Sequence, residues 1–426
     1  MNILMMTNTF TPHVGGVARS IEAFSAEYRR RGHRVLTVAP EFENIPAQEN
    51  DVIRIPAIQQ FNGSDFSVVL PIPRFIASEV KRFQPDVIHT HHPFLIGGTA
   101  LRLAHSMQIP LVFTHHTLYE QYTHYVPGDS KALKRFVVSL STHFANLCDT
   151  VIAPSESIAT LISERGVTSP IQVVPTGVDM TRFRDGNGSG FRASMGIPDD
   201  ALVIGHLGRL APEKNLVFLA SAVADYLELN PQAHFLVVGT GPLEQTIRNL
   251  FGQTNMQGRL HMAGTLGPAL VSAAYAAMDV FAFASKSETQ GMVLTEAMAA
   301  GVPVIALDAS GAREVVRDKK NGRLLMHESQ QDFVDALSWF ANLSPEELAA
   351  IKIQVESTAE AFSLPRTADK ALAIYQHLKG TKFVLSDDSF ENWKTGLRMI
   401  KAEWKMLKGL TGAALNVLES DLDISL

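Results

Sequence analysis

Two successive series of short apolar segments, with helix-like segments between them, constrain the fold of this chain most strongly. The opening forty residues predict a strand (2–6), a loop (7–16), a helix (17–31) and a second strand (35–39). Further strands of the first series are predicted at 87–89, 111–114, 150–153 and 171–174. Strands that alternate with helices pair in parallel sheets covered on both faces, so the chain is predicted to be an α/β protein.

A second series of apolar segments begins at residue 202. Its strands are predicted at 202–206, 234–238, 260–262, 280–284 and 302–307. Residues 182–200, between the two series, are rich in glycine and polar groups and are predicted to be a linker. We therefore expect two doubly wound parallel sheets that face each other across a cleft, with ligands at the carboxyl ends of the strands.

This pattern predicts four parts of the chain. They are a first domain (1–185), a second domain (200–362), a helix that crosses back to the first domain (363–380) and an amphipathic helical tail (386–426). Apolar residues of the tail repeat at spacings of three and four, with lysines largely off that stripe. Such a helix could lie in a membrane interface, dock on the body of the protein or pair with a second copy.

The composition of the 426 residues restricts the class of protein. A hydrophobic fraction of 46% and a charged fraction of 19% are typical of a soluble globular protein, and a net charge of −6 argues against a general nucleic-acid binder. The single cysteine, Cys148, excludes an internal disulfide and fits a reducing compartment. The short apolar segment at the start predicts a strand rather than a signal peptide. The sequence contains no run of about eighteen apolar residues, so no membrane span is predicted. We expect a cytoplasmic protein.

The stretch SKSETQGMVLTEAMAAGVP, residues 285–303, contains Glu288 and Glu296 eight positions apart. Between them Gly291 follows a polar turn and precedes an apolar run, which predicts the start of a helix. The amides of Gly291, Met292 and Val293 would then be available to an anion, with one carboxylate before the helix and one a turn inside it. The alternative is a capped surface helix with two solvated acids.

Two further loops carry candidate phosphate-binding residues. Gly15 and Gly16 directly precede the first helix, where they would let backbone amides approach a phosphate, although a tight turn would also use glycines. Arg209 and Lys214 follow the first strand of the second series, and two cations there suit a diphosphate leaving group. Solvated surface charge is the alternative.

Histidines cluster near the ends of strands in the first series. They are His89, His91, His92, His115, His116 and His124. No Asp or Cys accompanies them at ligand spacing, and adjacent pairs cannot easily face one metal ion, so we expect no metal site. One of these histidines could instead hydrogen-bond a substrate.

Together, Gly15 with Gly16, Arg209 with Lys214 in GRLAPEKN, and the pair Glu288 and Glu296 resemble the retaining glycosyltransferases of family 4, which have the GT-B fold. The resemblance covers about residues 1–380 and implies a nucleotide sugar, such as UDP-glucose, as co-substrate, with no required metal ion. It implies that Glu296 binds the ribose, that Glu288 contacts the transferred sugar and that Arg209 and Lys214 bind the diphosphate. The amides of Gly291, Met292 and Val293 would face sugar and phosphate, and His116, in THHT, would contact the donor sugar.

The mechanism implied by the resemblance is front-face displacement with retention, in which the departing diphosphate helps to take the proton of the acceptor. For the acceptor, HHTLYEQYTHYVP (115–127) and VVLPIPRF (68–75) are similar to stretches of bacterial diacylglycerol glucosyltransferases, which are peripheral membrane proteins. Candidate acceptor or membrane contacts are Tyr119, Tyr122, His124, Tyr125, Lys131, Lys134 and Arg135. The basic members could meet anionic lipid or be ordinary solvated charges. With this resemblance, the cytoplasmic protein is expected to be peripheral on the inner face of the membrane.

Three functions remain open on these residues. The first is transfer of a hexose, expected to be glucose, to diacylglycerol. The second is transfer to a soluble sugar or a polyisoprenoid-linked glycan. The third is binding of a sugar nucleotide without turnover, against which the presence of both glutamates and both diphosphate cations speaks. In each case the tail could also mediate self-association.

Overall fold

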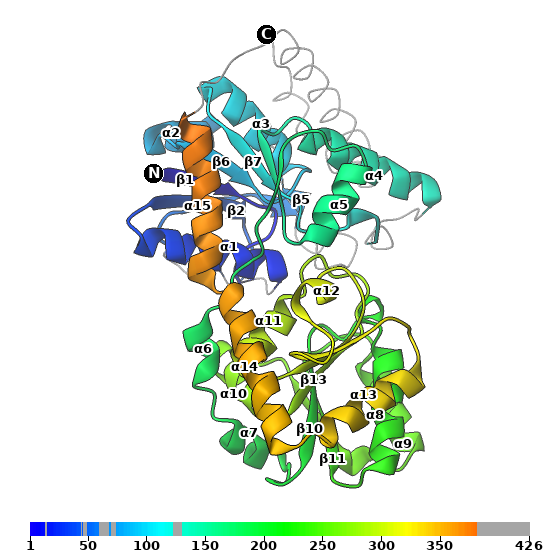
Figure 1. Ribbon diagram of the computed structural model, residues 1–426. Coiled ribbons are helices and arrows are strands. Elements are labelled where there is room, and N and C mark those ends of the chain that lie inside the picture. Colours follow the sequence, from blue (N-terminus) through cyan, green and yellow to red (C-terminus); the bar gives the residue numbers. More distant parts are fainter. Residues whose placement is uncertain are drawn as a thin grey trace. The chain divides into compact units, whose positions relative to one another are not determined.

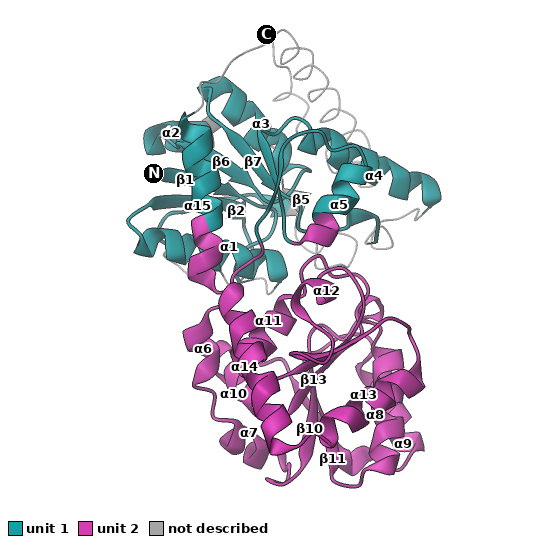
Figure 2. Ribbon diagram, in the orientation of Figure 1, with its two compact units in different colours: residues 1–154, 159–174, 370–426 teal, residues 155–158, 175–369 magenta. Residues whose placement is uncertain are grey.

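The computed structural model of the protein describes residues 1–12, 15–43, 45, 49–58, 68–69, 74–121 and 130–380, so the predicted tail lies outside the described residues. The chain divides into two compact units (Figures 1 and 2). Unit 1 comprises the described residues within 1–154, 159–174 and 370–380. Unit 2 comprises residues 155–158 and 175–369.

Unit 1 contains a seven-stranded parallel sheet with the strand order β3-β2-β1-β6-β7-β8-β9. The strands are β1 (Asn2–Met6), β2 (Arg34–Pro40), β3 (Val52–Ile55), β6 (Val87–Thr90), β7 (Leu111–Thr114), β8 (Thr150–Ala153) and β9 (Ile171–Val173). The helices between them are α1 (Gly16–Arg30), α2 (Arg74–Phe83), α3 (Ile96–Met107), α4 (Lys131–Ala145) and α5 (Glu156–Glu164). Every residue of β6, β7 and β8 is buried, because helices cover both faces of the sheet.

Unit 2 contains a six-stranded parallel sheet with the order β12-β11-β10-β13-β14-β15. The strands are β10 (Leu202–Leu207), β11 (Ala233–Val238), β12 (Leu260–Gly264), β13 (Val280–Phe283), β14 (Val304–Leu307) and β15 (Gly322–Leu325). The helices are α6 (Met180–Arg184), α7 (Gly188–Met195), α8 (Leu216–Leu229), α9 (Glu244–Gln253), α10 (Pro268–Ala276), α11 (Met292–Ala299), α12 (Ala312–Val315), α13 (Gln330–Ala341) and α14 (Pro345–Ala361).

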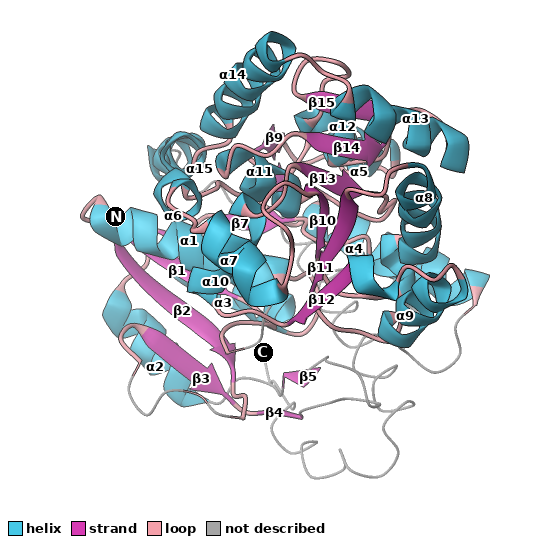
Figure 3. Ribbon diagram, turned by 90° about the horizontal axis from the view of Figure 1, so that it is seen from below, coloured by secondary structure: helices cyan, strands magenta, loops and turns pink. Residues whose placement is uncertain are grey.

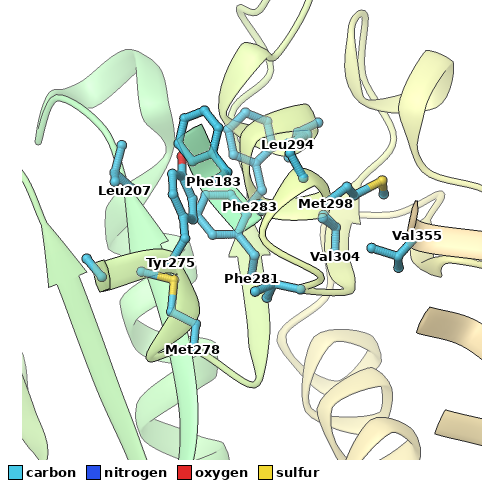
Figure 4. Packing of buried hydrophobic residues seen from close by; sticks show 14 of the residues in the cluster. Phe183, Leu207, Tyr275, Met278, Phe281, Phe283, Leu294, Met298, Val304 and Val355 are labelled. Carbon is cyan, nitrogen blue, oxygen red and sulfur yellow. The ribbon is translucent and has the colours of Figure 1, made fainter. Parts of the chain in front are cut away.

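The sheet of unit 2 separates two apolar cores, because successive strand residues point to opposite faces. Val203 belongs to one core and Ile204 to the other. The first core receives side chains from α6, α7, α10, α11 and α14, and the second from α8, α9 and α13 (Figure 3). Figure 4 shows part of the first core, in which Phe183, Tyr275, Phe281 and Phe283 pack together.

The predicted fold class, two doubly wound parallel sheets, is confirmed by this architecture. Strands β3 and β15 were not predicted. The prediction of a linker at 182–200 is wrong, since these residues contain the end of α6 and all of α7. Phe191 is buried in the first core of unit 2, so this segment is part of a packed layer.

The helix α15 (Leu364–Gly380) begins in unit 2, and its residues from 370 onward belong to unit 1 (Figure 2). Within unit 1, Tyr375 of α15 is fully buried and its ring lies edge-on to Tyr28 of α1, with ring centroids 5.9 Å apart. The Tyr375 hydroxyl also lies 2.6 Å from His89 Nδ1. Among the described residues, no helix has the length and apolar character needed to cross a membrane.

Candidate active site

The candidate site of unit 2 lies where the order of its strands reverses. β10 comes first in the chain, yet it lies between β11 and β13 in the sheet, so the chain winds away from it in both directions. In open parallel sheets the crevice at the carboxyl ends of two such strands binds ligands. Arg209 and Lys214 follow β10, while Glu288 and Gly291 follow β13, so the reversal brings both predicted loops to one edge of the sheet.

Lys214 and Glu288 form an ion pair across these two loops. Lys214 Nζ donates to Glu288 Oε1, and each side chain is 20% exposed. The hydroxyls of Ser285 and Ser287 both donate to the carbonyl oxygen of Glu213, at 3.3 and 3.1 Å, which ties the loop after β13 to the turn that contains Lys214. The cation is therefore held in place and remains reachable from solvent, and an incoming anion would compete with Glu288 for it.

Helix α11 begins at the predicted place, after Gly291. Gly291 has φ +70° and ψ +53°, a left-handed conformation that suits glycine, and its carbonyl accepts from the Leu294 amide at 2.9 Å. The preceding residue, Gln290, is buried and exchanges two hydrogen bonds of 2.7 Å with the backbone of Thr176. The predicted positions of the two acids along the helix axis are confirmed, since Glu288 precedes α11 and Glu296 lies one turn inside it.

Glu296 is almost fully buried, and its carboxylate is held by a tyrosine. The Tyr275 hydroxyl, on α10, donates to Glu296 Oε2 at 2.9 Å. The Tyr275 ring is itself fixed, because it packs edge-on against Phe183 and lies 5.7 Å from Phe281 (Figure 4). Sequence reasoning missed Tyr275, although a tyrosine in an otherwise apolar helix signals a buried partner for its hydroxyl.

His206, at the end of β10, is a second residue that sequence reasoning missed in unit 2. Its Nδ1 donates to the Ala282 carbonyl at 3.1 Å, and its buried Nε2 has no partner within the part of the chain that the structure describes. Burial, with a smaller contribution from the nearby Lys214, lowers the pKa of His206 to about 4. His206 is therefore uncharged at neutral pH, so the cationic groups on the loop after β10 are Arg209, which is exposed, and Lys214.

In unit 1 the predicted strand-end histidines are brought together. His91 Nδ1 lies 2.9 Å from His116 Nε2, and His89 contacts Tyr375 and, through Nε2, Thr114 Oγ1 at 2.6 Å. Burial lowers the pKa of His89 and of His92 to about 3, that of His115 to about 4 and that of His116 well below its ordinary value. These histidines are uncharged at neutral pH. The described residues contain no group of three or more His, Cys, Asp or Glu that could hold a metal ion.

Gly15 and Gly16 lie after β1, where the strand order of unit 1 reverses between β1 and β6. Gly15 is the N-cap of α1 and is extended, with φ −154° and ψ +161°, so it does not serve a turn of positive φ. Its carbonyl accepts from the Arg19 amide at 3.0 Å, which begins the helix. The position at a helix start agrees with the predicted use of these glycines, and their role toward a phosphate stays a prediction.

The predicted acceptor residues fall in three places. Tyr119 is half-buried in a short 3-10 helix (Tyr119–Gln121), edge-on to Phe94 with ring centroids 4.9 Å apart, and burial raises its pKa. Lys131, Lys134 and Arg135 are exposed on the first turns of α4, beside the exposed Phe136. Tyr122, His124 and Tyr125 lie outside the described residues.

Two family models match the chain, one after the other. Glycosyltransferase Family 4 matches residues 14–182, and Glycosyl transferases group 1 matches residues 190–355.

Three related proteins illustrate the range of similar sequences. An α-monoglucosyldiacylglycerol synthase of Streptococcus pneumoniae is 31% identical, over 76% of this chain and 75% of that protein. A second, of Acholeplasma laidlawii, is 28% identical over 76% of this chain and 84% of that protein. A GDP-mannose-dependent α-mannosyltransferase of Mycolicibacterium smegmatis is 31% identical over the same two shares, 76% and 84%.

Among solved structures, Anabaena HepE in complex with UDP superimposes with a TM-score of 0.71. The two sequences are 20% identical, and the match covers 88% of this chain and all of that one. The likeness shows the GT-B fold.

Replacing Tyr275 by Phe removes the hydroxyl that holds Glu296. We expect the free energy of unfolding to fall by about 1–3 kcal/mol, because a buried carboxylate loses a donor. We also expect weaker binding of a nucleoside diphosphate. Tyr226→Phe is the matched control, since the buried Tyr226 hydroxyl has no partner among the described residues. Urea unfolding and calorimetric titration with UDP and GDP measure both effects, and equal behaviour of the two variants would contradict the role of Tyr275.

The buried histidines of unit 1 predict a dependence of stability on pH. Their folded-state pKa lies below the unfolded value near 6.5, so the unfolded chain binds more protons and stability falls as pH decreases from about 6.5 toward 3. Each histidine contributes a slope of up to about 1.4 kcal/mol per pH unit. In urea unfolding between pH 7.5 and 5, His89→Gln should reduce the slope, whereas Gln376→Ala, at an exposed position of α15 that carries no titratable group, should not. An unchanged slope in His89→Gln would contradict the lowered pKa of His89 in the folded protein.

Proposed function

This chain belongs to glycosyltransferase family 4, and we propose that it transfers a hexose from a nucleoside diphosphate sugar to diacylglycerol at a membrane surface. The observation that carries the proposal is the Lys214 and Glu288 pair beside the start of α11, at the strand reversal of unit 2. The choice of glucose and diacylglycerol is supported by the two α-monoglucosyldiacylglycerol synthases among the relatives.

The proposed donor site uses opposite charges for different parts of the ligand. Lys214 and Arg209 neutralise the diphosphate, and the amides of Gly291, Met292 and Val293 approach its oxygens at the positive end of α11. Once Lys214 turns to the phosphate, Glu288 accepts a hydrogen bond from a hydroxyl of the sugar. Glu296, which Tyr275 holds in place, accepts hydrogen bonds from the hydroxyls of the ribose.

The proposed reaction retains the configuration of the anomeric carbon. The bond from this carbon to the diphosphate oxygen breaks, and the bond to the acceptor oxygen forms on the same face. The acceptor proton passes to the departing diphosphate, so neither an enzymic nucleophile nor a general base at Glu288 is needed. Arg209 and Lys214 stabilise the charge that develops on the leaving group, and we propose that they do so without a metal ion.

The proposed acceptor contacts lie in unit 1. His116 and Tyr119 offer polar groups to the acceptor or the sugar, and Lys131, Lys134 and Arg135 on α4 approach anionic lipid with Phe136 beside them. We propose that the protein binds the membrane surface peripherally through this helix. Tyr122, His124 and Tyr125 stay candidates in the same part of the chain.

A second candidate is transfer of mannose from GDP-mannose, with an acceptor other than diacylglycerol. It is favoured by the α-mannosyltransferase of Mycolicibacterium smegmatis, which is as similar in sequence as the glucolipid synthase of Streptococcus pneumoniae. The described contacts concern the groups that we propose bind the diphosphate and the ribose. UDP and GDP both contain these two parts, so the contacts favour neither nucleotide.

The acceptor proposal predicts a lipid product. With labelled UDP-glucose and diacylglycerol in vesicles containing anionic lipid, in the presence of a chelator, we expect an α-glucosyl diacylglycerol. Vesicles without diacylglycerol and reactions with GDP-mannose are the controls. Absence of a lipid product with every hexose donor would refute diacylglycerol as the acceptor. Equal product formation on a soluble sugar without vesicles would favour a soluble acceptor instead.

The donor proposal predicts that Lys214→Ala lowers kcat by about 10² or more, the scale expected when one charge-stabilising group is lost. Lys286→Ala is the matched control. Lys286 lies on the same loop as Glu288 and pairs with Glu328, but has no role in the proposed site, so its kcat should stay within about twofold. Steady-state kinetics of both variants decide the matter, and near-normal turnover in Lys214→Ala would remove this lysine from the site.

A further inference from the structure

The loop after β1 is held by an arginine from a strand that β1 does not touch. β3 is the edge strand of the sheet in unit 1, and β2 separates it from β1. The side chain of Arg54, on β3, nevertheless reaches the loop after β1, where its Nη2 donates to the Thr11 carbonyl at 2.6 Å. Its Nη1 donates to the carbonyl of Pro40, the last residue of β2, at 2.8 Å. One side chain therefore ties the ends of β3 and β2 to the loop after β1.

The guanidinium of Arg54 is itself fixed by a carboxylate and an aromatic ring. Its Nε and Nη2 donate to the two carboxylate oxygens of Glu49 at 2.7 and 2.6 Å, which makes a bidentate pair. Both side chains are largely buried, with exposed fractions of 9% and 14%. The guanidinium also lies over the ring of the buried Phe10, 5.5 Å from its centroid. Because Glu49 neutralises the charge of Arg54, the main effect of Arg54 on the loop is to hold its position.

The loop that Arg54 holds has two features of a ligand-binding loop. It follows β1, at the reversal of strand order between β1 and β6, where ligands bind to open parallel sheets. Two of its oxygens, Asn8 Oδ1 and Thr9 Oγ1, are buried and have no partner in the described part of the chain. Buried polar atoms of native proteins are nearly always hydrogen-bonded, so we expect a bound ligand to supply the missing partners.

We propose that Arg54 is a positioning residue, which keeps the loop after β1 in the form that binds substrate without contacting the substrate itself. The ligand assigned to the loop is the nucleotide sugar, because the loop leads to Gly15 and Gly16 at the start of α1, and this assignment rests on the proposed function. The role requires a guanidinium, whose planar fork holds several donors in fixed directions. A lysine ammonium could pair with Glu49 but could not at the same time reach both backbone carbonyls.

A looser loop should weaken binding in a defined way. If only a fraction of the molecules has the loop in its ordered form, the apparent affinity for a ligand that binds this form falls by that fraction. Once the ligand is bound, the loop is ordered in every molecule, so the turnover of the bound enzyme changes little. A fall of the ordered fraction to about a tenth would thus raise KM about tenfold and leave kcat nearly unchanged.

Arg54→Lys tests the proposal in the full-length protein. Hydrogen exchange without substrate reports the opening of residues 8–11, and steady-state kinetics with UDP-glucose and diacylglycerol report KM and kcat. We expect residues 8–11 to lose most of their protection from exchange, KM for UDP-glucose to rise about tenfold and kcat to stay within about threefold.

Arg323→Lys is the matched control. Arg323, in unit 2, also pairs with a carboxylate, that of Asp318 at 2.8 Å, and lies over an aromatic ring, that of Trp339 at 5.2 Å from the centroid. The contacts of Arg323 are thus of the same kind but lie away from the loop after β1. Arg323→Lys should change neither the exchange at residues 8–11 nor KM.

Two results would overturn the proposal. Unchanged exchange at residues 8–11 in Arg54→Lys would show that Arg54 does not hold the loop, and faster exchange with an unchanged KM would show that the loop does not bind the nucleotide sugar. Should Arg54→Lys fail to fold, the double variant Glu49→Gln with Arg54→Gln, which leaves no unpaired charge, takes its place with the same expected results. If the protein transfers no hexose to diacylglycerol, the proposed function fails, but exchange and calorimetric titration with UDP still test Arg54.

Discussion

The reversal of strand order between β10 and β13 is the constraint on which the site of unit 2 depends. Because the chain winds away from β10 in both directions, the loops after these neighbouring strands share one edge of the sheet. One loop carries Lys214 and the other Glu288, so opposite charges meet although 74 positions separate them. The two serine hydroxyls on the Glu213 carbonyl hold this meeting in place. The sheet topology thus brings Lys214 and Glu288 together, and local hydrogen bonds hold the two loops at a fixed distance.

The side chains that support the site are uncharged. Gln290 fixes the start of α11 through the backbone of Thr176, and Tyr275 fixes Glu296. Gly311 has φ +82°, and a Cβ atom there would lie 2.6 Å from the backbone of Gln290, so the loop after β14 packs directly on the start of α11. Neutral supports leave the charges of Lys214 and Glu288 to act on a ligand, and a held geometry need not be reorganised when charge develops.

Sequence reasoning predicted those features that depend on local pattern. The strands around the site, the start of α11 at Gly291 and the heights of Glu288 and Glu296 follow from periodicity and turn chemistry. The linker prediction was wrong because glycine-rich segments occur both in flexible linkers and where two backbones pack closely. A Cβ atom on Gly186 or Gly188 would lie 2.3 or 2.2 Å from carbonyl oxygens of α10, so these glycines allow close packing rather than flexibility. Tyr275 and His206 depend on contacts distant in sequence. The apolar helix around Tyr275 signals a buried partner for its hydroxyl, but no local pattern shows that this partner is Glu296.

The two units place opposite kinds of polar group at their strand reversals. Unit 2 sets exposed or half-buried charges there, which suits a diphosphate. Unit 1 sets histidines whose burial keeps them uncharged, although a cluster of histidines in a sequence suggests a cation or a metal ligand. The cost of desolvating a charged imidazole decides between these two possibilities, and His89, His91, His92 and His116 each have a hydrogen-bond partner for a neutral ring. Uncharged donors and acceptors discriminate by the direction of a hydrogen bond, and this is the property by which a hydroxyl differs from a phosphate.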